Sequence, residues 1–383
     1  MSDSKRGDSR AWVRTIAAIS LEPMTLGRVV VLLVAMAWCA PVSAQSPTSE
    51  PPAAQQSDTN DPPSPWLIVP VFSSSPKLGT AFGGLGAFLH TFDPASRVSL
   101  FGIMYEYTST HSQIASVFAR TSLGADHHRI VTIVALGHIK NDYDDYLGTG
   151  QPLRTDADMR AVAARYLFRT KNNWFIGAQG NAANYQVMGA TPEDDLVLET
   201  LGVRGFQSAA LGAAVMHDSR DNEDMPTKGW FLNMNNLAYR EALGGASSYD
   251  AYRADFKIFL EHGGGHVLAI RQFNWLTSDA PAAAEATVVL RGYKLGQYLS
   301  PYMSSLEAEE RLSFSARWGA TLFAGAAQLY GEAPVALSRT TYPTVGAGLH
   351  FVIKPEQHML VNLEYAQGVE GNRGLYLKLG YAW

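Results

Sequence analysis

LYLKLGYAW, residues 375–383 at the end of the chain, alternates strictly between two kinds of side chain. One face of an extended strand would carry only large apolar groups, namely Leu375, Leu377, Leu379, Tyr381 and Trp383. The other face would be mixed, since it includes Lys378 and Gly380. Such period-two alternation predicts a β-strand that has one apolar face.

The same alternation returns along the chain from residue 66 onward. Residues 252–260 and 162–168 each place apolar side chains on one face and charged side chains on the other. In a membrane-spanning barrel the apolar face meets lipid and the charged face lines the lumen. We expect sixteen strands, with fourteen as the fallback count, near residues 66–73, 78–90, 96–109, 112–122, 127–139, 157–170, 173–186, 205–217, 229–240, 248–261, 264–276, 304–316, 318–329, 342–353, 356–366 and 374–383.

The connectors between these windows differ in length in a regular way. Most connectors after odd-numbered strands are long, namely 140–156, 187–204, 277–303 and 330–341. Those after even-numbered strands are mostly tight, such as 170–172, 262–264 and 354–356. Long outer loops and short periplasmic turns are typical of outer-membrane barrels. The predicted fold class is therefore all-β, a transmembrane antiparallel β-barrel.

Composition excludes several other classes of protein. Charged residues make up 17% of the chain and the formal net charge is −5, so no basic footprint for nucleic acid is present. After residue 45 no stretch approaches the ~18 uninterrupted apolar residues of a membrane-spanning helix. Any membrane segments there must be strands.

The N-terminal region predicts export. An apolar run over residues 29–40 follows Arg28 and ends in Val42-Ser43-Ala44, the order of a secretory signal peptide over residues 1–44. Residues 45–65 are rich in Pro, Ser and Gln, which predicts a disordered lead-in. We expect residues 66–383 to form one barrel domain in the outer membrane. Cys39, the only cysteine, lies inside the signal, so the mature chain is expected to have none.

Two motifs carry a resemblance to a known superfamily. The stretch HDSRDN (217–222), with PTKG at 226–229, resembles the D-x-R-D-N…P-T-x-G turn of BamA, TamA and two-partner-secretion transporters, the bacterial surface antigen barrel domain. Its residues here are Asp218, Arg220, Asp221, Asn222, Pro226 and Gly229. The second motif, Leu290, Arg291, Gly292 and Tyr293, is similar to the (V/L)-R-G-(F/Y) tip of that superfamily's sixth outer loop, and five predicted strands follow it.

The resemblance implies that Arg291 folds into the lumen and meets acidic residues on strands twelve and thirteen. Glu309 begins an E-x-R pattern and should face the lumen, because Leu312 and Phe314 alternate outward. Gly325 stands where an Asp is common in the superfamily. We therefore predict an Arg291–Glu309 ion pair, with an ordinary solvated Arg291 as the alternative. A second R-G-aromatic sequence lies at 203–206. Nine predicted strands follow it, where the motif of the superfamily is followed by five, so we interpret it as a chance match.

The last strand resembles the aromatic-ended signal that barrel-assembly machinery recognises during biogenesis. Its residues are Lys378, Gly380, Tyr381 and Trp383, and an interfacial aromatic girdle in contact with outer-membrane lipid is the alternative. In the first strand, Pro70 cannot donate a ladder hydrogen bond. We therefore expect a weak seam between the first and last strands, as a lateral gate requires, with a fully paired seam as the alternative.

The resemblance implies protein translocation or membrane insertion. Residues 45–65 leave no room for the POTRA domains that usually precede such barrels, so a separate periplasmic partner is one expectation and a stand-alone pore or structural surface protein is the alternative function. No enzymatic activity and no cofactor are expected. His217-Asp218-Ser219 are adjacent, so their side chains would point to opposite sides of a strand. No metal site is expected either, since Asp142, Asp144 and Asp145 are more simply a solvated loop.

Overall fold

A computed structural model describes residues 65–75, 79–143, 153–200, 205–223, 225–281, 284–295, 297–332, 339–354 and 359–381. The predicted signal peptide, residues 1–44, and nearly all of the predicted lead-in, residues 45–65, lie outside this set.

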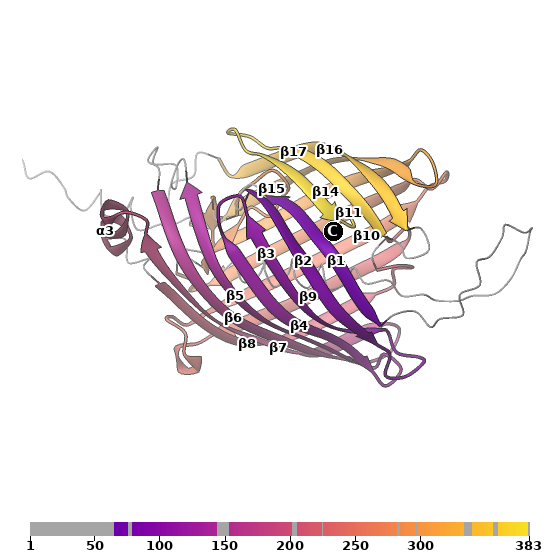
Figure 1. The fold of residues 1–383 in the computed structure, drawn as a ribbon, viewed down its shortest axis with the longest axis horizontal. Helices are drawn as coiled ribbons and strands as arrows, with labels where there is room; N and C mark the ends of the chain where they lie inside the picture. The colour runs from indigo at the N-terminus through magenta and orange to yellow at the C-terminus, as the bar shows by residue number, and fades with distance from the viewer. Residues whose placement is uncertain are drawn as a thin grey trace, which may run out of the picture.

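Sixteen strands form one antiparallel sheet whose order follows the sequence (Figure 1). They are β1 (Trp66–Ser75), β2 (Gly79–His90), β3 (Ser99–Thr108), β4 (Gln113–Leu123), β5 (His128–Tyr143), β6 (Leu153–Arg169), β7 (Trp174–Gly189), β8 (Gly205–Asp218), β9 (Gly229–Tyr239), β10 (Tyr249–Glu261), β11 (Val267–Ser278), β14 (Tyr302–Ser313), β15 (Trp318–Tyr330), β16 (Thr341–Lys354), β17 (Met359–Gln367) and β18 (Arg373–Leu379). The predicted class, an all-β antiparallel barrel, is confirmed.

The outer face of β14 is apolar and its inner face is charged, whereas the inner face of β1–β5 carries an apolar cluster. In β14, Leu306 is 55% exposed, whereas its neighbour Glu307 is 4% exposed and Glu309 is fully enclosed. A water-soluble sandwich would bury the leucine and expose the glutamates. The alternation read from the sequence of β14 therefore corresponds to a lipid-facing outer surface and a charged lumenal surface.

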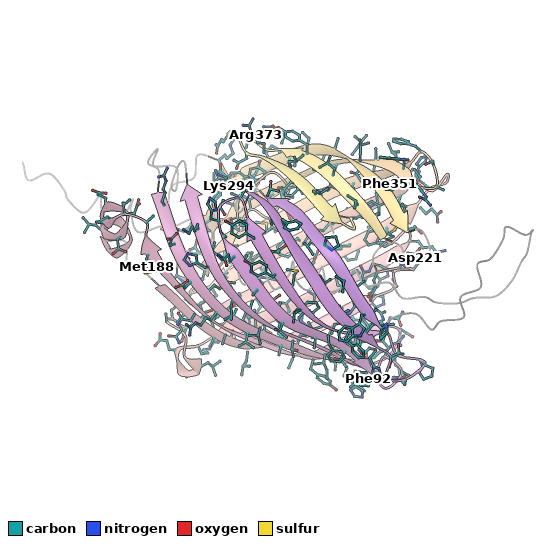
Figure 2. The ribbon with its side chains drawn as sticks, in the orientation of Figure 1. Phe92, Met188, Asp221, Lys294, Phe351 and Arg373 are labelled. Carbon is teal, nitrogen blue, oxygen red and sulfur yellow. The ribbon has the colours of Figure 1, made fainter. Side chains whose placement is uncertain are left out.

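The two ends of the barrel carry different connectors. Figure 2 shows Phe92 and Asp221, which follow the even-numbered strands β2 and β8, at one end and Met188 at the other. The β6–β7 connection is tight, with Asn172 and Asn173 at φ +52° and +61°, a conformation that asparagine tolerates well. At the opposite end the connectors include α3 (Pro192–Thr200) and η1 (Glu241–Leu243).

Two features of the long connectors differ from the sequence prediction. The sixth outer connector is not structureless, because β12 (Ala286–Thr287) pairs with β13 (Leu299–Ser300) within it. β5 and β6 also extend four residues further outward than predicted, to Tyr143 and from Leu153. The ladder continues there through charged positions, since Lys140 pairs with Asp156 and Asp142 with Arg154.

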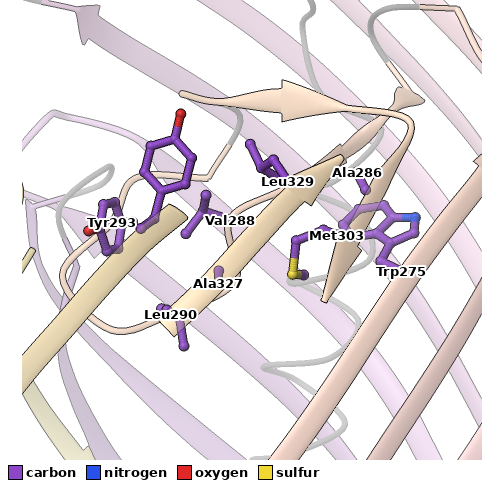
Figure 3. Packing of buried hydrophobic residues seen from close by; sticks show 9 residues of the cluster. Trp275, Ala286, Val288, Leu290, Tyr293, Met303, Ala327 and Leu329 are labelled. Atoms are coloured by element: carbon purple, nitrogen blue, oxygen red, sulfur yellow. The ribbon is translucent and has the colours of Figure 1, made fainter. Parts of the chain in front are cut away.

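The sixth connector folds back into the barrel and supplies an apolar cluster there. Figure 3 shows Val288, Leu290 and Tyr293 of this connector together with Met303 and Leu329 of the barrel wall. Leu290 and Tyr293 are 6% and 2% exposed. This packing places the connector's tip, with Arg291, inside the lumen.

The first and last strands lie beside each other, as the indigo and yellow ribbons of Figure 1 show. Every other neighbouring pair in the sheet is joined by a backbone ladder, but within the described residues no ladder joins β1 to β18. Pro70 lies in β1 opposite Gly84 of β2. The part of the chain that is described also contains no helix long and apolar enough to cross a membrane.

Candidate functional site in the lumen

The side chain of Arg291, at the tip of the sixth outer connector, is held by three carboxylates. Its Nη1 lies 2.6 Å from Glu309 Oε2, and its Nη2 lies 2.9 Å from Glu307 Oε1. Nη1 also lies 3.1 Å from Glu364 Oε1, on β17. Arg291 is 7% exposed, so this charge is desolvated and depends on the carboxylates for compensation. The structure thus brings the predicted pair, Arg291 and Glu309, together.

The barrel wall is shaped to accept this guanidinium group. The Arg291 Cζ atom lies 3.4 Å from the centroid of the Phe323 ring. Gly346 leaves room for that ring, since a Cβ atom there would come within 2.1 Å of it. Gly348 does the same for Glu364, whose Cγ would lie 2.7 Å from an added Cβ. Glycines on β16 therefore make the space in which the charge is bound.

The backbone of the motif is fixed as well as its side chain. The Gly292 N–H donates to Tyr376 Oη at 2.7 Å, and Thr344 Oγ1 donates to the Arg291 carbonyl at 2.7 Å. Gly292 has φ +96°, a conformation that disfavours any residue with a Cβ. This explains why the motif needs glycine after the arginine.

Tyr293 locks the tip against the last two hairpins. Its hydroxyl donates to the Pro343 carbonyl at 2.5 Å and accepts from the Val369 N–H at 3.1 Å. Its ring occupies the place that a Cβ on Gly368 would need, at 2.6 Å. All four residues of the predicted motif, from Leu290 to Tyr293, are therefore buried and in contact with the wall.

Glu309 links this tip to the two other predicted motifs. Its second oxygen, Oε1, accepts from Arg311 Nε at 2.8 Å. Arg311 Nη1 donates to the carbonyl of Pro226, in the β8–β9 turn, at 3.2 Å. The Arg311 Cζ atom also lies 3.8 Å from the ring centroid of Tyr381, after the last strand. We call Arg291, Glu307, Glu309, Glu364 and Arg311 the lumenal ion network.

The β8–β9 turn is itself built from its motif residues. Arg220 Nε and Nη2 donate to the two oxygens of Asp218 at 2.8 and 2.9 Å, and Arg220 Nη1 donates to the Glu223 carbonyl at 3.1 Å. Gly229 has φ +98°, and a Cβ there would lie 2.2 Å from the Ser219 carbonyl oxygen. Only glycine fits where the chain re-enters the sheet.

Asp221 and Asn222 cap backbone N–H groups inside the same turn. Asp221 Oδ1 accepts from the N–H groups of Thr227 and Lys228, and its Oδ2 accepts from Thr227 Oγ1 at 2.7 Å. Asn222 Oδ1 accepts from the Met225 N–H at 2.8 Å. Burial acts to raise the pKa of Asp221, but these hydrogen bonds outweigh it and hold that pKa below its usual value.

The turn also reaches the opposite part of the wall. Glu223 forms an ion pair with Arg97, which precedes β3, and lies 4.0 and 3.9 Å from Arg120 of β4 and Arg129 of β5. Because Pro226 of the same turn contacts β14, the turn bridges widely separated strands at this end of the barrel.

Sequence reasoning missed part of the network. Glu307 lies two residues before Glu309 on the same face of β14, so alternation alone could have indicated it. Glu364 could not be found this way, because its position depends on the register of β17 with β16. Gly325 pairs with Glu307 in the β14–β15 ladder, so the carboxylate missing from β15 is supplied by β14 and β17 instead.

Other predicted residues do not come together in the structure, or they lie outside the described part of the chain. His217 stacks on Trp230 at 3.7 Å between centroids, whereas Asp218 binds Arg220, so the adjacent His-Asp-Ser residues face different partners. Lys378 lies in β18 opposite Asn362. Trp383, Arg204, Asp144 and Asp145 are outside the described residues. Among those that are described, no group of three or more His, Cys, Asp or Glu side chains is arranged to hold a metal ion.

Comparisons with known proteins give structural matches alone. No family model matches the chain, and no curated protein does. BamA from Haemophilus ducreyi lacking POTRA domains 1–3 matches with a TM-score of 0.57 at 11% identity, over 82% of this chain and 70% of that one. CdiB from Escherichia coli matches with a TM-score of 0.58 at 11% identity, over 84% and 63%.

CdiB from Acinetobacter baumannii gives a TM-score of 0.57 at 9% identity, over 82% of this chain and 59% of that one. The chain therefore spans less than two thirds of each CdiB. At these identities the likeness establishes the fold.

Proposed function

We propose that this outer-membrane β-barrel, whose fold is of the BamA/TamA type, translocates polypeptides across the outer membrane or inserts them into it. The observation that carries the proposal is the Arg291 tip, which is lodged in the lumen and bound to Glu309. A loop fixed there occupies the lumen near β14–β18, as the resemblance of the motif from Leu290 to Tyr293 implies. Export through a cleaved signal over residues 1–44 is part of the proposal.

The β1–β18 seam supports a lateral gate as the route. Within the described residues no ladder joins the two strands, and Pro70 removes one donor from β1. Gly380, just after β18, has φ +84° and donates its N–H back to Leu360 of β17 at 2.8 Å. Unpaired strand edges are costly in a bilayer, so a substrate strand that pairs with them would be stabilised.

The gate is tested by disulfide locking, which the expected lack of cysteine in the mature chain makes simple. Cysteine pairs are placed on residues 67–72 and 376–380 and oxidised in the folded barrel. The locked seam should abolish delivery of a labelled polypeptide into or across vesicles that contain the barrel, and reduction should restore it.

The matched control joins strands that already share a ladder. Leu67 lies opposite Ala87 in β1–β2, so the double variant Leu67→Cys/Ala87→Cys should cross-link without loss of delivery. A barrel that delivers substrate equally well with its seam locked would exclude the gate.

A stand-alone pore is the second candidate, favoured by the polar side chains on the inner wall of β6–β10. Conductance without any polypeptide substrate would support it. A separate periplasmic partner belongs to the first candidate, and a protein recovered by cross-linking to the β8–β9 turn in native membranes would support that partner.

A further inference from the structure

A row of polar side chains crosses the inner wall from β6 to β11. Arg165 of β6 lies opposite Gln179 of β7, and Asn235 of β9 lies opposite Arg253 of β10. Arg253 in turn lies opposite Trp275 of β11. None of these residues belongs to the lumenal ion network, although Trp275 packs in the same apolar cluster as Leu290.

Neither arginine of this row has a carboxylate partner among the described residues. Arg165 donates from Nε and Nη2 to Gln179 Oε1 at 2.9 and 2.5 Å, and from Nη1 to Asn233 Oδ1 at 3.2 Å. All of these acceptors are neutral. Gln179, which accepts from Arg165, donates to Asn235, and Asn235 lies opposite Arg253. The two cations are therefore joined through neutral amides, with no anion in the row.

Arg253 is the less satisfied of the two. Its Cζ atom lies 4.2 Å from the ring centroid of Trp275, so one face of the guanidinium is covered by an aromatic ring. Its Nε is shielded from solvent and meets no acceptor in the described part of the chain. A shielded donor without an acceptor is costly, and the cost is larger when the group is charged.

The carboxylate two residues along β10 does not supply the missing charge. Asp255 accepts from Arg271 Nε and Nη2 at 2.8 and 3.1 Å, and it lies 3.6 Å from Lys257 Nζ. It already serves two cations. This part of the wall, from β6 to β11, therefore carries an excess of positive charge.

Neutral amides hold the row in place. Gln179 Nε2 donates to Asn235 Oδ1 at 3.1 Å and to the Asn236 carbonyl at 3.0 Å, which directs Gln179 Oε1 toward Arg165. The Gln179 side chain reaches β9 across Gly212, where a Cβ would lie 1.8 Å from the Asn236 oxygen. The geometry is thus fixed by residues that leave the arginine charges uncompensated.

We propose that Arg165 and Arg253 form a binding site for a dissolved oxyanion of the phosphate type on the lumenal wall. Guanidinium groups bind such oxygens in pairs, and two arginines that are joined through Gln179 and Asn235 and have no carboxylate partner suit a doubly charged ligand. The site lies on the inner face, so the ligand comes from the aqueous lumen and a lipid headgroup in the surrounding bilayer does not reach it.

The test measures the temperature at which the purified barrel loses its folded, heat-modifiable form on gels, with inorganic phosphate or with chloride at equal ionic strength. Phosphate should raise the midpoint of the wild type, because a ligand that binds only the folded state stabilises it. More than half of that rise should be lost in Arg253→Gln and in Arg165→Gln. In chloride, Arg253→Gln should unfold at the wild-type temperature or above it, since the substitution removes an uncompensated charge.

Arg160→Gln is the matched control, because Arg160 is an exposed arginine on the outer face of the same strand. It should keep the full phosphate response. An equal rise in all four proteins would mean a general salt effect, and no rise in the wild type would mean no site. Either result overturns the proposal.

Discussion

Two regions of the lumen each contain a pair of arginines, and the pairs differ in their countercharges. On the β14–β18 side, Arg291 and Arg311 both contact Glu309, at 2.6 and 2.8 Å. On the β6–β11 side, Arg165 and Arg253 contact amides and an aromatic ring. The residue type and the polar lumen are the same in both. The difference indicates that an arginine with a neighbouring carboxylate fixes the structure, whereas one without a carboxylate is available to a ligand. Burial alone does not distinguish the two.

The distinction has an energetic basis. Removing one partner from a buried ion pair costs about 3–5 kcal/mol, because the other charge is left uncompensated. An arginine that has no carboxylate partner leaves no such charge behind when it is replaced. Substitutions on the two sides should therefore change stability by different amounts and even with different signs.

The largest effect is expected for Arg291→Ala. The change would leave Glu307, Glu309 and Glu364 close together without the cation that compensates them. We expect a loss of about 3–5 kcal/mol in the free energy of unfolding, measured by urea titration, and rapid proteolysis of the sixth connector. Arg253→Gln is the comparison and should lose little or nothing. Equal losses in both variants would remove the distinction between the two regions.

An intermediate effect is expected for Arg311→Gln. Glu309 would keep Arg291, but the contacts of Arg311 with Glu309 and with the Pro226 carbonyl would be lost. We expect a loss of about 1–3 kcal/mol and new protease cleavage within residues 219–228. Replacing the exposed Arg317 by Gln should change neither the free energy of unfolding nor the pattern of protease cleavage. If the protease cut the sixth connector earlier than it cut the β8–β9 turn, the prediction that Arg311 mainly holds the turn would be contradicted.

The smallest effect is expected from the titration of Asp221. Its pKa is held below the usual value in the folded state, so it contributes stability above the unfolded value of about 3.9, and this is lost as the pH falls through the folded pKa. Unfolding of the wild type and of Asp221→Asn, followed between neutral and acidic pH, should converge at the acidic end. A constant difference between them would show that this carboxylate does not contribute through its charge.

Local alternation was enough to predict most of the wall. It gave the strand windows and the inward direction of Glu309, because a period of two depends on neighbouring residues alone. The Arg291 contact followed from the motif resemblance together with that direction. The short β12–β13 pair was not predicted, since two-residue strands carry no periodic signal.

Contacts that depend on register could not be predicted. Glu364 reaches Arg291 only because β16 and β17 pair as they do, with Gly348 opposite Glu364. The placement of Arg165 and Arg253 in one row depends in the same way on several ladders in succession, from β6 to β10. A shift of one residue in any of them would turn the side chains to the other face.

The position of Glu309 between two arginines has a consequence for how the ends of the barrel communicate. One oxygen binds the outer connector through Arg291, and the other binds Arg311, which contacts the β8–β9 turn at the opposite end. Linkage is reciprocal, so any effect of the turn on the affinity of Glu309 for Arg291 is matched by an effect of the outer connector, of the same free energy, on the affinity of Glu309 for Arg311. Because two cations draw on one carboxylate, the sign of that free energy reflects their competition as well as their shared positioning.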